Sequence, residues 1–105
     1  MGPYAMLALA IASEVVATSA LKASYGMTRL APASLVVVGY SAAFYLLALT
    51  LKTLPVGVVY AIWSGLGMVG VALIGAILFG EPLGAVKLAG IALIIAGVAL
   101  LNSVI

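Results

Sequence analysis

Residues 4–21 read YAMLALAIASEVVATSAL, an apolar run with one carboxylate, Glu14, near its middle. A helix that crosses a bilayer needs about 20 mostly apolar residues. The run is too long and too uniformly apolar for the alternating strands of a membrane β-barrel. No Lys or Arg precedes it and an acidic residue interrupts it, so we do not expect a cleaved signal peptide. The stretch therefore predicts a first transmembrane helix that carries a charge inside the membrane.

Three further apolar runs follow, separated by short segments that contain Pro, Gly or polar residues. The four predicted helices cover about residues 4–21, 33–51, 56–79 and 86–104. The 105-residue chain is 68% apolar and 6% charged, whereas an ordinary soluble domain carries about 25% charged residues. This composition excludes a soluble catalytic domain. We predict an all-α membrane protein with one transmembrane domain, residues 1–105, and four transmembrane helices.

The charged side chains are too few and too scattered to bind a polyanion. The net charge is +2, and the six charged residues are Lys22, Arg29, Lys52, Lys87, Glu14 and Glu81. No basic patch follows from this distribution, so we expect no nucleic-acid partner. The chain has no Cys and no His, and its glycine pairs lack the lysine and the strand context of a phosphate-binding loop. We therefore expect no metal site, no cofactor and no enzymatic activity.

Glu14 is the most informative residue of the sequence. A charge at the bilayer centre costs about 2.5–3.5 kcal/mol on insertion scales, and such residues usually face a bundle interior or a wet cavity on an ion or proton pathway. A neutral, hydrogen-bonded carboxylic acid is the structural alternative, although a neutral polar residue would serve that purpose at lower cost. The residues that share its helix face, at three- and four-residue spacing, are Leu7, Ala10, Ile11, Ala17, Thr18 and Leu21. The small ones leave room for a cavity or for close helix packing.

Aromatic residues occur at helical spacing in the second and third spans. Tyr40 and Phe44 are four residues apart, and Tyr60 and Trp63 are three apart. Aromatic faces attract organic cations, most strongly when water is excluded. The alternative is an interfacial aromatic belt, which fits Tyr40 and Trp63 poorly because they lie well inside their spans. Together with Glu14, these rings predict a site for a hydrophobic cation, and a carboxylate that holds either a cation or protons is the minimal device for antiport.

Four short helices are too few to enclose a gated pathway, so we expect a homodimer in which Glu14 is contributed twice. Gly90 and Gly97 lie two helical turns apart and open a groove on the fourth helix that suits a helix–helix contact. The basic residues favour one membrane side by three to one, a weak orientation bias. Insertion in both orientations, followed by antiparallel pairing, would supply the inverted symmetry that larger transporters encode as repeats.

Several short motifs resemble a known family. They are ASEVVAT at residues 12–18, GMTRL at 26–30, LPVG at 54–57, YAIWSGLG at 60–67 and FGEPL at 79–83. Together they resemble the small multidrug resistance transporters over nearly the whole chain. The resemblance implies a proton-coupled exporter of toxic cations in a bacterial inner membrane that works as an antiparallel homodimer. It also implies that Glu14 binds substrate and protons in turn.

The resemblance also assigns roles to other residues. It implies that Tyr40, Tyr60 and Trp63 line the substrate site and that Gly90 and Gly97 form the dimer contact. Two positions bear on the substrate. Many relatives have a serine where this chain has Ala43, and that serine hydrogen-bonds near the glutamate. Guanidinium exporters typically carry a tryptophan where this chain has Ala17, so the chain resembles the multidrug branch, which takes quaternary ammonium and polyaromatic cations.

Three other functions remain open at this point. A guanidinium exporter of the same family differs only in its substrate. A proteolipid subunit of the ATP-synthase type also holds a membrane carboxylate, but it has two spans with the acid in the second. A lipid-carrier flippase or accessory subunit would have no proton coupling of its own.

Overall fold

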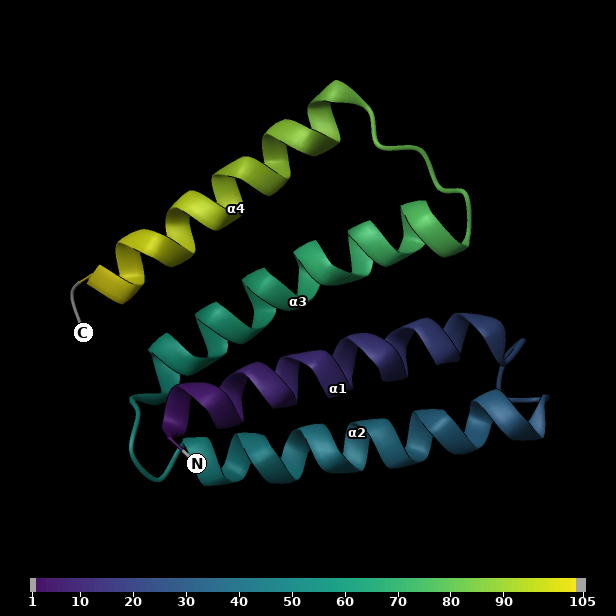
Figure 1. The fold of residues 1–105 in the computed structure, drawn as a ribbon, viewed down its shortest axis with the longest axis horizontal. Coiled ribbons are helices and arrows are strands. Elements are labelled where there is room, and N and C mark those ends of the chain that lie inside the picture. Colours follow the sequence, from purple (N-terminus) through teal and green to yellow (C-terminus); the bar gives the residue numbers. More distant parts are fainter. Residues whose placement is uncertain (1, 104–105) are drawn as a thin grey trace.

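The computed structural model describes residues 2–103, and this part of the chain forms four helices. They are α1 (Pro3–Ala23), α2 (Leu30–Thr50), α3 (Val56–Leu78) and α4 (Ala85–Ser103), and consecutive helices run in opposite directions (Figure 1). Each of the four is long and apolar enough to cross a bilayer. The prediction of an all-α protein with four transmembrane helices is confirmed. Four spans with the acid in the first also argue against a proteolipid subunit.

The helix ends follow local backbone chemistry. The second helix begins at Leu30, three residues before the predicted start, because Pro32 lies in its first turn, where a missing N–H costs no intrahelical hydrogen bond. The third begins directly after Pro55. After α3 the chain reverses at Gly80, whose φ of +64° is in the left-handed region that glycine adopts without strain. The predicted last residue of the fourth span, Val104, lies outside the described residues.

Helix α1 is the centre of the arrangement and packs against both α2 and α3. Its contact with α2 depends on Gly39, because a Cβ there would lie 2.8 Å from the Cβ of Ala17 and 3.2 Å from the carbonyl oxygen of Ser13. Its contact with α3 includes Gly70, where a Cβ would lie 2.9 Å from a Val15 methyl group. Small residues therefore bring both neighbours close to α1, as is usual for helices packed within membranes.

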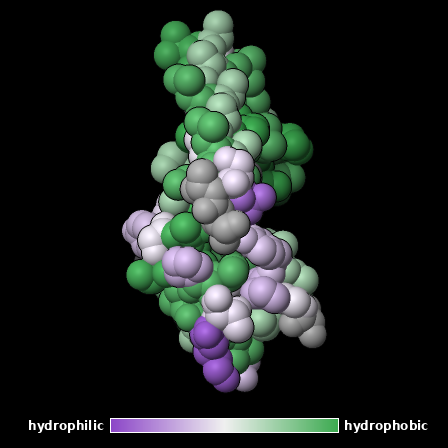
Figure 2. All heavy atoms as spheres, turned by 90° about the vertical axis from the view of Figure 1, so that its left-hand side faces the viewer, coloured by the Kyte–Doolittle hydropathy of each residue, from purple (hydrophilic) through white to green (hydrophobic). Residues whose placement is uncertain are grey.

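Helix α4 lies on the outside of this three-helix group. None of its described residues is buried, and it meets α3 where Ile94 and Val98 approach Gly65. It diverges from α3 toward the connecting loop (Figure 1). In the end-on view, the part of the surface that α4 forms is almost wholly hydrophobic (Figure 2). The surface of α4 is therefore available to lipid or to another chain.

The connections lie at two ends of the helix group, as expected for four successive crossings. The α1–α2 and α3–α4 loops share one end, and the α2–α3 loop lies at the other (Figure 1). The first end carries Lys22, Arg29 and Lys87, and the second carries Lys52. The three-to-one distribution of basic residues that the sequence indicated is thus retained in the structure.

Candidate functional site

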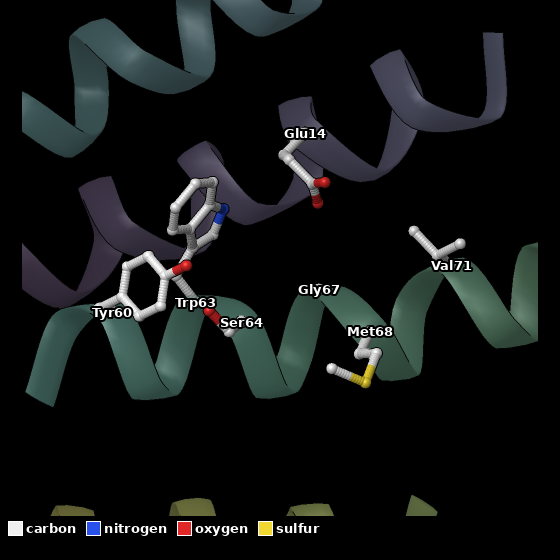
Figure 3. Close-up of a pocket in the computed structure, with 7 residues that line it drawn as sticks. All are labelled: Glu14, Tyr60, Trp63, Ser64, Gly67, Met68 and Val71. Atoms are coloured by element: carbon white, nitrogen blue, oxygen red, sulfur yellow. The ribbon is translucent and has the colours of Figure 1, made fainter. Parts of the chain in front are cut away.

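Glu14 faces a pocket between α1 and α3. The pocket has a volume of about 290 Å³ and is lined by Glu14, Tyr60, Trp63, Ser64, Gly67, Met68 and Val71. Six of these residues belong to α3 and recur at intervals that keep them on one helix face. Figure 3 shows the Trp63 ring projecting from α3 toward α1, while the Glu14 carboxylate points back toward α3 near Gly67. The pocket thus places one charged group opposite a mostly apolar and aromatic wall.

The absence of a side chain at Gly67 lets the carboxylate approach the α3 backbone. Gly67 is buried, and a Cβ built on it would lie 3.0 Å from Oε2 of Glu14. That distance is shorter than nearly all real Cβ contacts. Glu14 therefore rests directly against α3, and any larger residue at position 67 would have to displace it.

A chain of hydroxyl groups connects Glu14 to α2. The Thr18 hydroxyl donates a hydrogen bond of 2.9 Å to Oε1 of Glu14, and the Thr18 and Tyr40 hydroxyl oxygens are 2.6 Å apart. Because the single Thr18 proton is directed to the carboxylate, Tyr40 is the donor in the second bond. Three predicted site residues, Glu14, Thr18 and Tyr40, are thus brought together by hydrogen bonds.

Four aromatic rings form a continuous series from α2 to α3. Tyr40 stacks on Phe44 at 6.3 Å between ring centroids, and Phe44 meets Trp63 edge to face at 6.0 Å. Tyr60 meets Trp63 edge to face at 5.7 Å. Phe44 and Tyr60 remain 55% and 62% exposed, respectively, so the rest of the chain leaves this aromatic wall open on one side. Edge-to-face pairing leaves ring faces free for a cation.

The chemistry of these groups suits an organic cation. One carboxylate supplies the opposite charge, and the rings supply flat apolar surfaces with negative faces. A hard metal ion would need several oxygen ligands, and Glu14 is the sole acidic residue among those that line the pocket.

Comparison with known proteins identifies the family to which this site belongs. Residues 2–94 match the family described as Small Multidrug Resistance protein. The chain belongs to the small multidrug resistance family. It is therefore a multi-pass bacterial membrane protein, as the sequence motifs predicted.

Curated relatives match this small multidrug resistance protein over most of their length. The quaternary ammonium compound-resistance protein QacE of Escherichia coli is 51% identical and aligns with 97% of this chain and 93% of its own length. A multidrug transporter of Pseudomonas aeruginosa is 56% identical over 93% of this chain and 89% of its own. The multidrug resistance protein EbrA of Bacillus atrophaeus is 48% identical over 94% of both chains.

Other residues that the sequence assigned to the site lie in the helix packing of this small multidrug resistance protein. Leu7, Ala10, Ala17 and Ala43 are almost fully buried, and Ile11 packs against the core cluster of Leu7, Val59 and Ile62. The methyl group of Ala17 lies against Gly39 of α2. The room expected beside Glu14 at Ala17 is therefore filled by α2, and the pocket opens on the α3 side instead.

Four lining residues were not among the predicted ones, namely Ser64, Gly67, Met68 and Val71. A signal for all four is present in the sequence. Starting from Tyr60 and Trp63, the three- and four-residue spacing that was applied to Glu14 leads to Ser64 and Gly67. The same step taken again leads to Met68 and Val71 on the same face of α3.

Gly67→Ala should weaken cation binding about tenfold, because the added methyl group must push the Glu14 carboxylate away from α3, and overpacking of this kind typically costs about 1–3 kcal/mol. The loss of affinity is measured by the binding of tetraphenylphosphonium to the purified protein. Gly57→Ala is the matched control on the same helix, since its Cβ would meet no described atom within 4 Å. Equal affinity in the two variants would show that the carboxylate does not depend on this contact.

Proposed function

We propose that this small multidrug resistance protein is a proton-coupled antiporter that exports aromatic and quaternary ammonium cations across the bacterial inner membrane. The observation that carries the proposal is the placement of Glu14. Its carboxylate lies inside a membrane-spanning helix, faces a pocket, and has Tyr60 and Trp63 on the opposite wall. Intramembrane carboxylates with these surroundings mark ion and proton pathways.

Exchange follows from the presence of one negative charge in the pocket. When Glu14 is ionised, an organic cation neutralises it and lies against the rings. When Glu14 is protonated, the pocket is neutral and loses its electrostatic attraction for a cation. Release of one ligand therefore favours binding of the other, so a cation can leave against its gradient while protons enter.

The pocket favours large delocalised cations over guanidinium. Tyr60 and Trp63 supply flat walls, whereas guanidinium is small and needs fixed hydrogen-bond acceptors around it. Ala43 supplies no hydroxyl group on α2. The names of the relatives support the same branch, since they include quaternary ammonium compound resistance and, at 50% identity, putative ethidium bromide resistance.

We further propose that the working unit is an antiparallel homodimer. The aromatic wall is open on one side, and α4 has no buried residue in the described part of the chain. A Cβ at Gly90 or Gly97 would meet no described atom within 4 Å, so this glycine groove is free to receive a second α4. The weak bias of basic residues allows insertion in both orientations, and a pair of opposite orientation would offer the site to each membrane side in turn.

Glu14→Gln should abolish both cation-driven proton release and the pH dependence of cation binding, because the amide retains the shape and loses the titrating charge. Proton release from detergent-solubilised protein on addition of tetraphenylphosphonium measures the coupling. Glu14→Asp is the control that keeps the charge, and it should retain part of the release. Full coupling in the Gln variant would place the exchange site elsewhere, and cation binding without proton release in the unaltered protein would favour a non-coupled carrier.

Gly90→Leu and Gly97→Leu should each reduce dimerisation, because a bulky side chain blocks the close approach of two α4 helices. Crosslinking in membranes measures the dimer fraction. Gly84→Leu, in the loop before α4, is the control, since its Cβ would also meet no described atom within 4 Å. Undiminished dimers in both α4 variants would move the interface to another face.

Substrate currents recorded on supported membranes at one pH should be larger for quaternary ammonium and aromatic cations than for guanidinium. Trp63→Ala should weaken binding of the large cations about two- to thirtyfold, which corresponds to the loss of about 0.5–2 kcal/mol of cation–π attraction. Strong guanidinium currents together with none from quaternary ammonium would instead assign the chain to the guanidinium branch.

A further inference from the structure

A second carboxylate and a second aromatic ring meet an ammonium group at the end of the helix group that carries the α1–α2 and α3–α4 loops. Lys22, in the last turn of α1, forms an ion pair with Glu81 in the α3–α4 connection. The Lys22 ammonium also lies 4.9 Å from the centroid of the Phe79 ring. A cation held by one carboxylate and one aromatic face is the same combination that Glu14 and Trp63 offer in the pocket between α1 and α3, called the central pocket below.

The backbone after α3 holds this second pair of groups in place. Gly80 reverses the chain with a φ of +64°, and the Glu81 N–H then donates a hydrogen bond of 3.1 Å to the Gly75 carbonyl. A Cβ at Gly75 would collide with the Glu81 carboxylate. The missing side chain at position 75 therefore lets the carboxylate rest against α3, one helical turn from the Phe79 ring.

A second cavity lies beside this arrangement and shares the lining residue Val71 with the pocket that Glu14 faces. It has a volume of about 160 Å³ and is lined by Thr18, Ser19, Lys22, Val71, Gly75, Phe79 and Glu81. Val71 lines the central pocket as well, and Thr18 donates its hydrogen bond to Glu14. Glu14, Thr18 and Lys22 follow one another at four-residue intervals on one face of α1. The two carboxylates thus lie along one groove between α1 and α3.

The charge state and the exposure of these groups permit exchange with a solute. The Lys22 hydrogen bond and charge, with a smaller contribution from the Lys87 charge, hold the pKa of Glu81 below its usual value, so Glu81 is ionised at neutral pH. The side chains of Lys22 and Glu81 are 53% and 42% exposed. Exposed ion pairs of this kind are weak, so an external cation can displace the Lys22 ammonium.

We propose that Glu81 and Phe79 form a second cation site, here called the outer site, at the end of the α1–α3 groove. It is specific for ammonium groups and is occupied by the Lys22 side chain when no ligand is bound. An arriving cation replaces Lys22 on the carboxylate and the ring. The inference rests on the proposed function only in that organic cations enter the groove, and it does not involve proton exchange at Glu14.

The composition of the chain provides a separate reporter for each site. The sequence contains two phenylalanines, Phe44 beside the central pocket and Phe79 in the outer site, and one tryptophan. Fluorophenylalanine labelling therefore gives fluorine NMR signals from both sites, which Phe44→Leu and Phe79→Leu assign. The labelled protein is placed in phosphatidylglycerol bilayers, whose headgroups carry no ammonium, and titrated with tetraethylammonium.

The Phe79 signal should respond to tetraethylammonium, and in Lys22→Met it should respond at about two- to fivefold lower concentration, because the competing exposed ion pair is gone. Adding Glu81→Gln to Lys22→Met should remove the response. Gly75→Ala should weaken the response while keeping every charge. Lys87→Met is the matched control, since Lys87 donates to the Pro82 carbonyl and not to Glu81, and it should shift the titration far less than Lys22→Met.

The same titration in a Glu14→Gln background separates this inference from the proposed function. There the Phe44 signal and the Trp63 fluorescence should no longer respond, while the Phe79 response persists. A Phe79 signal that stays constant in Lys22→Met, or that responds equally without the Glu81 charge, would overturn the outer site. Phosphatidylserine has the same net charge as phosphatidylglycerol but carries an ammonium group. If phosphatidylserine bilayers move the titration to higher concentration, the ammonium that competes for the site is a lipid headgroup, whereas an unchanged titration assigns the site to free cations.

Discussion

The contact on which the structure depends is the one between the Glu14 carboxylate and the backbone of α3 at Gly67. An ionised group at this depth is costly in lipid, so it must be covered by protein. Thr18 donates to one carboxylate oxygen, and Gly67 leaves space for the other. Small residues elsewhere have a related effect, because Gly39 and Gly70 bring α2 and α3 close to α1. The packing of α1 thus directs one of its faces toward α2 and leaves the Glu14 face to the pocket.

Much of the fold and of the candidate site could be predicted from the sequence. The four spans follow from apolar run length, and the importance of Glu14 follows from the cost of its burial. Helical spacing alone placed Tyr60 and Trp63 on one face, and that face lines the pocket. Spacing within a helix does not say which neighbour a face meets. Ala17 was therefore assigned to the cavity, although its methyl group packs against Gly39 of α2.

Contacts between segments that are distant in the sequence could be identified only from the structure. Lys22 and Glu81 are 59 positions apart, and nothing in the local pattern of either residue indicates the other. Their meeting depends on the crossing of α1 and α3 and on the reversal of the chain at Gly80. The role of Gly67 could not be predicted from the sequence either. A glycine in an apolar helix indicates close helix packing, and only the structure shows that the atom opposite Gly67 is a carboxylate oxygen.

The two carboxylates have different solvent surroundings, and this difference suits different steps of transport. Glu14 lies within a span, where the proposed exchange requires that a proton and a cation exclude each other, whereas Glu81 lies outside the spans and stays ionised beside Lys22. A cation at Glu81 would be held weakly and could reach or leave the groove without a change of protonation. In the proposed antiparallel pair, the ends that carry the α1–α2 and α3–α4 loops of the two chains face opposite membrane sides. Each membrane side would then carry one outer site, so that one sequence supplies a cation site at both the entrance and the exit of the transport pathway.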